Sequence, residues 1–172
     1  MTKLYLANVK PYKEKEVKLS DDKSVVVGFR LYKEEELKEF NEVIASEALA
    51  VNVLKEQLIA FEAEGKSEEE LKGFMDNAEK LTNLDKELTD KFIVKAKESI
   101  IFFKNVTLTS INEETFEEVD STIADTRKGE HKDSFDYIRS NIFATKEEEL
   151  SLLEAFNEIR NIDFKAEQLK NL

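Results

Sequence analysis

The first part of the chain shows the two-residue period of β-strands. Residues 16–20 alternate polar and apolar side chains, and residues 25–32 are rich in β-branched and aromatic residues. Turn-forming residues at 20–24 separate these two runs, which predicts a β-hairpin. Residues 4–9 are a candidate for a third strand. Gly28, inside the second run, indicates a bulge or a close approach of another part of the chain.

From Lys33 onward the apolar residues recur every three or four positions, which is the period of an amphipathic helix. This pattern predicts a long helix that ends near Gly65. A second helical region follows over residues 67–104, and the pattern allows either one helix or two. Its start, Ser67-Glu68-Glu69-Glu70, has the form of a capping box. The first apolar stripe consists of Leu37, Phe40, Ile44, Ala48, Val51, Leu54, Leu58 and Phe61.

Three shorter helices are expected in the rest of the chain. Residues 105–111 are rich in Thr and Asn and are interpreted as a connector. Asn112-Glu113-Glu114-Thr115 then predicts the start of a helix that ends near Gly129. A short helix is expected around Ile138. Thr145-Lys146-Glu147-Glu148 is a second capping box, and it begins a terminal helix whose apolar positions are Leu150, Leu153, Phe156 and Ile159.

These elements predict an α+β fold that is mainly α. An N-terminal β-hairpin or small antiparallel sheet would pack on a bundle of about five helices. No linker rich in Pro, Gly or Ser divides the chain, so we expect a single domain over residues 1–172. Its β segment would cover residues 1–32 and its helical part residues 33–172.

Composition restricts the function more than the fold. The 172 residues include no cysteine and one histidine, and Lys and Arg against Asp and Glu give 26 − 38 = −12 as the net charge. The absence of cysteine excludes disulfides and thiolate chemistry. The acidic balance opposes binding to nucleic acid or to an anionic membrane. No apolar run is long enough to span a bilayer, so a cytoplasmic protein with a protein partner is expected.

Few residues offer catalytic or metal-binding chemistry. His131 lies in a hydrophilic stretch without a second histidine or a cysteine, and is expected to be an exposed loop residue. Acidic triplets at residues 34–36, 68–70 and 147–149 fall in the first turns of predicted helices, where carboxylates interact favourably with the helix dipole. We therefore expect no enzyme activity, no catalytic residues, no cofactor and no metal site.

Two apolar segments exceed what one helical stripe requires. Residues 100–103 are predicted to be the centre of the core, with a self-association or client-binding face as the alternative. The last helix extends its apolar series toward the chain end. The predicted partner-binding residues there are Ile159, Ile162, Phe164 and Leu169, and the same surface allows a homo-oligomer.

The order of elements resembles the tail-assembly chaperones of long-tailed phages of Gram-positive bacteria. The resemblance lies in the β segment that runs into a helix at residues 25–37 and in Val106-Thr107 followed by Asn112-Glu113-Glu114-Thr115-Phe116. It implies a cytoplasmic, non-enzymatic protein of infected cells. Such a protein binds the tape-measure protein and helps recruit tail-tube subunits.

The sequence thus supports an acidic interaction protein, most specifically a tail-assembly chaperone. The alternative is an acidic decoy or inhibitor that occupies the basic groove of a nucleic-acid-binding protein. The net charge of −12 favours this alternative, and the 26 interspersed basic residues oppose it.

Overall fold

The structure is a computed structural model that describes residues 12–20 and 23–160. The chain divides into two compact units. Unit 1 contains the described residues up to Lys33 and those from Ile93 onward, and unit 2 is Glu34–Phe92. That these units belong to a single domain stays a prediction.

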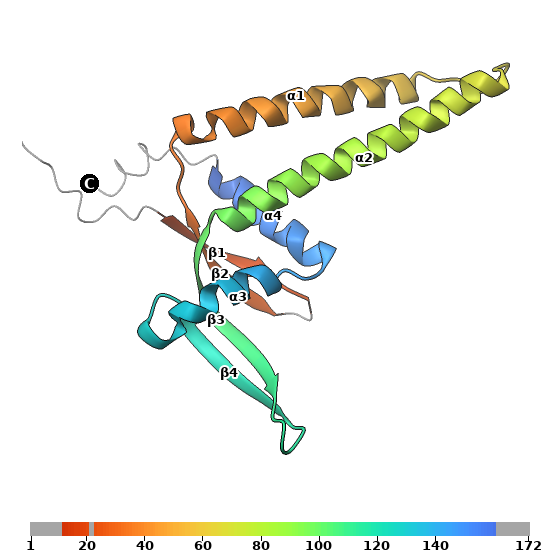
Figure 1. Cartoon of the computed structure of the whole chain (residues 1–172). Coiled ribbons are helices and arrows are strands. Elements are labelled where there is room, and N and C mark those ends of the chain that lie inside the picture. Colours follow the sequence, from red (N-terminus) through yellow and green to blue (C-terminus); the bar gives the residue numbers. More distant parts are fainter. Residues whose placement is uncertain (1–11, 21–22, 161–172) are drawn as a thin grey trace, which may run out of the picture. The chain divides into compact units, whose positions relative to one another are not determined.

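Unit 1 contains a four-stranded antiparallel sheet made of two hairpins (Figure 1). Its strands are β1 (Tyr12–Lys18), β2 (Ser24–Arg30), β3 (Ile100–Ile111) and β4 (Glu118–Asp125), in the order β1-β2-β3-β4. The predicted N-terminal hairpin is confirmed, since Val17 pairs with Val25 and Lys15 with Val27. The candidate strand at residues 4–9 lies outside the described residues.

Two helices pack against one face of this sheet. They are α3 (Phe135–Asn141), which follows the 3₁₀ helix η1 (Gly129–Ser134), and α4 (Lys146–Arg160). The ring of Phe156 on α4 lies 6.5 Å from that of Phe29 on β2, and the ring of Phe103 on β3 lies 5.7 Å from that of Phe135 on α3. These aromatic rings and the surrounding Val, Leu and Ile side chains form the core of unit 1.

Gly28 lies at a bulge, as its position in the sequence predicted. The register between β2 and β3 shifts between Gly28 and Phe29. A Cβ atom at position 28 would stand 2.2 Å from the ring of Phe102, which is buried on β3. Only glycine leaves room for this ring against the backbone of β2.

Unit 2 consists of two antiparallel helical segments joined by a turn. Helix α1 is Glu34–Ile59, and helix α2 is Glu68–Glu98, which continues into unit 1. Of the two alternatives for the second helical region, the structure therefore shows a single helix. The rings of Phe40 and Phe92 pack edge to face with centroids 5.5 Å apart, and the rings of Phe61 and Phe74 stack at 4.5 Å. Phe40 and Phe61 belong to the apolar stripe predicted for residues 37–61, and these contacts show that this stripe faces α2.

The ends of these helices agree with the sequence in part. Helix α1 ends at Ile59 and not near Gly65, which lies in the connecting turn with φ of 77°. The capping box at the start of α2 is confirmed, because the N–H of Ser67 donates to Glu70 at 2.9 Å and the N–H of Glu70 donates to Ser67 Oγ at 3.3 Å.

The prediction of about five helices is wrong, since residues 12–20 and 23–160 contain four α-helices. Residues 100–103 belong to β3, not to the end of a helix, and residues 105–111 continue this strand. The predicted helix at residues 112–129 is a turn followed by β4. The Asn112 side chain accepts the N–H groups of Glu114 and Thr115, so the bonds that suggested a helix start instead close a hairpin turn.

The second capping box is confirmed and also joins two elements of unit 1. Glu148 accepts the N–H of Thr145 at 3.0 Å, and Glu148 N–H donates to Thr145 Oγ1 at 3.2 Å. The same buried carboxylate accepts the N–H and the hydroxyl of Ser20 in the β1–β2 turn. Burial opposes ionisation, but the hydrogen bonds from Ser20, Thr145 and Ala144 outweigh it and lower the pKa of Glu148 to about 2.

None of the helices in the described ranges is long and apolar enough to cross a membrane.

We predict that Glu148→Gln lowers the free energy of unfolding by about 1.5–3 kcal/mol, because it weakens charge-assisted bonds to a buried group. The ordinary pKa of 4.5 is lowered to about 2 in the folded protein. The contribution is therefore complete above pH 4.5 and is lost as the pH falls toward 2. Urea unfolding between pH 2 and 7 measures it. Glu147→Gln, at an exposed position in the same helical turn, is the control; equal curves for both variants would contradict the prediction.

We predict that Gly28→Ala destabilises the protein by about 1–3 kcal/mol, because the added methyl group displaces the Phe102 ring. Gly73→Ala is the matched control. Gly73 lies in α2 with no atom within 4 Å of an added Cβ, so alanine there should stabilise by up to about 1 kcal/mol. Thermal unfolding of both variants checks the prediction, and an unchanged melting temperature for Gly28→Ala would contradict it.

Candidate functional site

Strand β3 has two parts with different neighbours. Its first part, up to Lys104, pairs with β2 on one side, and its last β2 partner is Val26. From Lys104 to Ile111 it pairs with β4 on the other side. The β3–β4 hairpin therefore continues beyond the β1–β2 hairpin (Figure 1). Along this second part, no strand within the described ranges pairs with the side of β3 that faces away from β4.

The backbone of β3 changes its hydrogen-bonding phase at Asn105. The carbonyl of Phe103 accepts the N–H of Thr126, whereas at the far end the N–H of Asn112 donates to the carbonyl of Glu117. Between them Asn105 has a φ of 59°, in the left-handed region. Bonds between antiparallel strands involve every second residue. Counting back from Asn112, the backbone groups of Val106, Leu108 and Ser110 point to β4, and those of Thr107 and Thr109 point to the open side.

A cleft of about 570 Å³ lies along this open side. Apolar residues from three parts of unit 1 line it: the end of the β1–β2 hairpin, β3, and α3 with the residue that follows it. Thr107 and Thr109 also line it, so the open side of β3 is accessible from the cleft. Among the described residues of its lining, Lys23 and Asp120 are charged. The apolar residues are Leu19, Val25, Val106, Leu108, Ile138 and Ile142.

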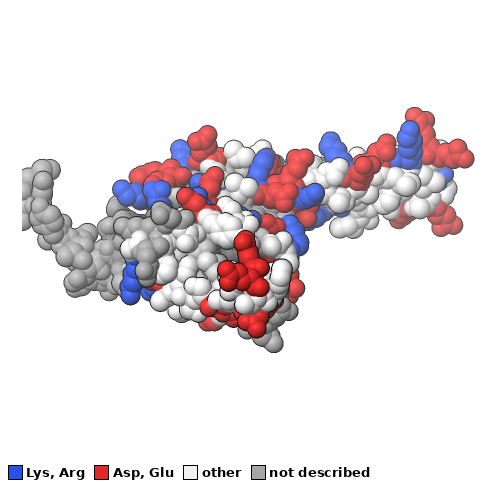
Figure 2. All heavy atoms as spheres, turned by 60° about the horizontal axis from the view of Figure 1, so that its bottom comes forward, with Lys and Arg blue, Asp and Glu red and all other residues white. Residues whose placement is uncertain are grey.

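The hairpin beside the cleft is acidic. Residues 105–124 contain five carboxylates and no Lys or Arg. Figure 2, in which the lower side of Figure 1 faces the viewer, shows acidic side chains gathered there without blue atoms among them. Apolar side chains are exposed on the same hairpin, most of all Phe116 at 83%. The carboxylates are Glu113, Glu114, Glu117, Glu118 and Asp120.

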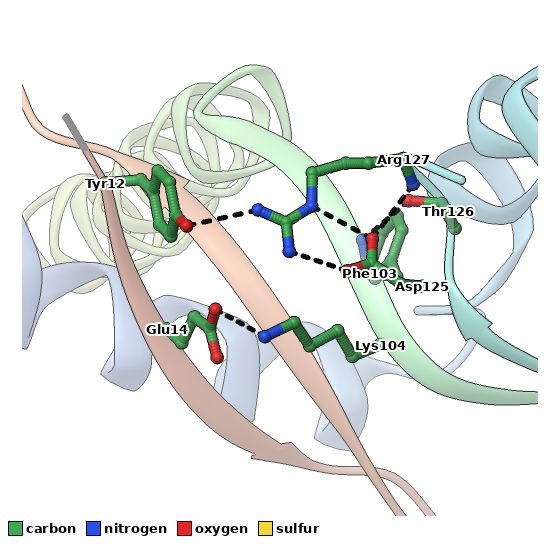
Figure 3. A network of polar contacts seen from close by, with 7 residues as sticks. All are labelled: Tyr12, Glu14, Phe103, Lys104, Asp125, Thr126 and Arg127. Atoms are coloured by element: carbon green, nitrogen blue, oxygen red, sulfur yellow. Dashed lines mark hydrogen bonds and ion pairs between the residues drawn. The ribbon is translucent and has the colours of Figure 1, made fainter. Parts of the chain in front are cut away.

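A polar network lies on the sheet face turned away from α4 (Figure 3). Arg127 donates to both carboxylate oxygens of Asp125, at 2.9 and 2.6 Å, and to the hydroxyl of Tyr12 at 3.1 Å. Lys104 forms an ion pair with Glu14 at 2.6 Å. The guanidinium of Arg127 lies 3.7 Å from the centre of the Phe102 ring. The network joins the edge strand β1 to the end of β4.

This network connects the hairpin to β1, and its charged groups are bonded to one another. The hydrogen bonds from Arg127 lower the pKa of Asp125 to about 2, against the opposing effect of its burial. Thr126 Oγ1 accepts the N–H of Phe103 at 3.0 Å, which holds the end of β4 against β3. The lowered pKa is thus explained by internal bonds of the fold.

One of the four predicted partner-binding residues lies in the part of the chain that the structure describes. Ile159 on α4 is 2% exposed and packs in the core of unit 1, while Ile162, Phe164 and Leu169 lie outside the described residues. Their role stays a prediction. Of the segment 100–103, Ile100, Phe102 and Phe103 are buried and Ile101 is 40% exposed. The interpretation of this segment as core is therefore confirmed for three of its four residues.

His131 and the three acidic triplets, the candidates for catalytic or metal-binding chemistry, lie within helices of the fold. His131 is half-buried in η1, where its N–H donates to the carbonyl of Lys128 at 3.0 Å, so it is not the exposed loop residue expected. The three acidic triplets do lie in the first turns of α1, α2 and α4. Within residues 12–20 and 23–160, no three acidic or histidine side chains are placed to hold a metal ion.

The elements predicted from the sequence do not indicate this cleft. Its β3 residues belong to the predicted connector, although residues 106–109, Val-Thr-Leu-Thr, alternate apolar and hydroxyl side chains. This alternation is a strand signal. Together with the turn at residues 112–117 it would have indicated a second hairpin. The approach of α3 to this strand had no signal in the local pattern.

We predict that Arg127→Lys lowers the free energy of unfolding by about 1–3 kcal/mol, because lysine keeps the charge but cannot form the paired bonds to Asp125 or stack on Phe102. Arg139→Lys is the control. Arg139 forms a single bond to Asp136, whose side chain is exposed, and lies 5.2 Å from the centre of the Phe135 ring, farther than Arg127 from Phe102. The same substitution should therefore cost less than about 0.5 kcal/mol there. Urea unfolding compares the two. A loss of equal size in both variants would show that the network is not important for stability.

Comparison of the chain with protein-family models, with curated proteins and with solved structures found no match.

Proposed function

We propose that this protein acts by binding another protein and carries out no catalytic step. The observation that carries the proposal is the open apolar cleft beside the part of β3 that has β4 on one side only. An apolar cleft next to strand backbone groups suits a polypeptide ligand, because it offers both apolar burial and hydrogen bonds.

The placement of the charged groups supports a binding function. The carboxylates with strongly lowered pKa values, Asp125 and Glu148, are occupied by hydrogen bonds that hold strands and helices together. The two charged residues of the cleft lining, Lys23 and Asp120, belong to different hairpins. Asp120 accepts a hydrogen bond from the hydroxyl of Thr109 at 2.7 Å. These are the environments of structural and surface residues.

The specific function we propose is that of a tail-assembly chaperone in the cytoplasm of a phage-infected cell, with the tape-measure protein or tail-tube subunits as clients. Residues 25–37 support it, because β2 runs into α1 there in the order that the resemblance implies. The segments at residues 106–107 and 112–116 differ from that layout, since they form the β3–β4 hairpin. The apolar cleft supplies a surface for a client.

A second candidate is an acidic decoy that binds a basic protein in place of nucleic acid. The five carboxylates of residues 105–124, without an intervening base, favour it. The two candidates differ in their dependence on salt. Binding dominated by charge weakens steeply as ionic strength rises, whereas binding dominated by apolar burial does not.

We predict that the tagged full-length chain co-purifies with a phage tape-measure protein when the two are produced together, and that the complex persists at about 0.5 M NaCl because apolar contact dominates. Leu108→Lys places a charge in the cleft and should weaken capture at least about tenfold. Leu150→Lys, at an exposed position of α4, is the matched control. Circular dichroism verifies that both variants are folded.

Absence of a complex with tape-measure and tail-tube proteins would contradict the chaperone function. Capture of a basic nuclease or repressor that is lost at about 0.5 M NaCl would support the decoy instead. Equal capture by both leucine variants would place the binding site away from the cleft.

A further inference from the structure

We propose that the cleft binds an extended segment of the partner, rich in Lys or Arg and in β-branched residues, which adds to β3 as a fifth strand along the side opposite β4. This inference rests on the proposed function, because it names the binding mode of the same cleft. Strand addition uses backbone hydrogen bonds for affinity and pockets for alternate side chains for specificity.

The first support is the open backbone of β3. The register with β2 ends at Lys104, while the strand continues to Ile111. The hydrogen-bonding phase set at Asn112 directs the N–H and C=O groups of Thr107 and Thr109 to the open side. Both residues line the cleft. The open stretch of residues 106–111 has the length of an average strand, so it can hold a complete short strand.

The second support is the composition of this edge compared with the outer edge of the sheet. Edge strands in proteins usually carry charges that prevent pairing with another chain. β1 follows this rule, since five of its seven residues, Tyr-Lys-Glu-Lys-Glu-Val-Lys, are charged. The open part of β3, Val-Thr-Leu-Thr-Ser-Ile, has no charged residue and no proline. It is therefore chemically suited to pair with an added strand.

The third support is the shape of the surroundings. Side chains of an added strand alternate between two faces. On one face the cleft offers Leu108 of β3 and Ile138 and Ile142 from the α3 region. Leu19 and Val25, from the ends of the β1–β2 turn, bound the cleft where β2 stops. Apolar residues at every second position of the ligand would thus be buried.

The charge of the hairpin determines which segment is favoured. Residues 105–124 contain five carboxylates and no base, so lysine or arginine at the remaining positions of the ligand would be attracted and acidic residues repelled. Among the described residues that line the cleft, Lys23 is the one basic residue. A segment rich in cationic and β-branched residues could both form backbone hydrogen bonds with β3 and be attracted by the carboxylates of the hairpin.

The test uses the full-length chain and a synthetic twelve-residue peptide in which valine alternates with lysine. On binding, the amide protons of Thr107 and Thr109 should exchange at least about tenfold more slowly, and those of Leu108 and Ser110, already bonded to β4, should change little. A peptide with glutamate in place of lysine should bind at least about tenfold more weakly. Amide hydrogen exchange followed by NMR and a titration of chemical shifts give both results.

Thr109→Pro removes the N–H that faces the open side and leaves the bonds to β4 in place. It should weaken peptide binding by about tenfold or more, whereas Thr109→Val, which keeps the N–H, should retain affinity within about threefold. Both variants lose the hydroxyl bond to Asp120, so they are matched. If Thr109→Pro unfolds the hairpin, the amide exchange of the unsubstituted chain still shows whether the peptide pairs with β3.

Three results would overturn the proposal. One is binding without protection of Thr107 and Thr109, which would show docking through side chains alone. Another is protection of these amides in the chain without peptide, which would show that the open side of β3 is already occupied. Size-exclusion chromatography would then distinguish a second copy of the chain from a segment of the same chain. The third is no binding of either peptide. In each case the proposed function is tested separately by co-purification with the client, because co-purification does not depend on how the client is bound.

Discussion

Unit 1 depends on one constraint, which is that two consecutive phenylalanines of β3 are buried on opposite faces of the same sheet. Phe103 points to the helices and contacts Phe135 and Phe143. Phe102 points to the other face, where it lies against Gly28 and beneath Arg127. Burying both rings requires β3 to be an inner strand with cover on each side. The helices supply this cover on one face and the network of Figure 3 supplies it on the other.

The open side of β3 follows from how the neighbouring elements end. The β1–β2 hairpin is short, and its turn is held to α4 through the bonds of Ser20 to Glu148. β3 continues past this turn because β4 pairs with it as far as Ile111. The left-handed backbone of Asn105 marks the point where the backbone hydrogen bonds of β3 change their alternation between the β2 side and the β4 side. A cleft at the junction is the geometric result of two hairpins of unequal length that pair with each other through β2 and β3.

The charges of unit 1 divide into two groups with different roles. One group consists of internal pairs such as Asp125 with Arg127, where hydrogen bonds lower the pKa of the carboxyl to about 2. The other group is the set of carboxylates on the β3–β4 hairpin, which have no base among them in residues 105–124. The first group stabilises the fold, and the second is available to select a cationic partner.

The sequence by itself determined the elements whose signals are local. The alternation at residues 16–20 and 25–32 predicted the first hairpin, the three-and-four spacing predicted α1 and α2, and both capping boxes predicted helix starts that the structure shows. Each depends on residues within a few positions of one another, so the pattern along the chain contains the necessary information.

Only the tertiary structure decided the second hairpin and the cleft. The apolar run at residues 100–103 is compatible with a buried helix or a buried strand, and pairing with β2, about 75 residues earlier, selects the strand. Asn112 accepts N–H groups in the same way at a helix start and in a hairpin turn, so its signal was ambiguous. The contact of α3 with β3 and the open backbone beside it depend on residues that the local pattern does not connect.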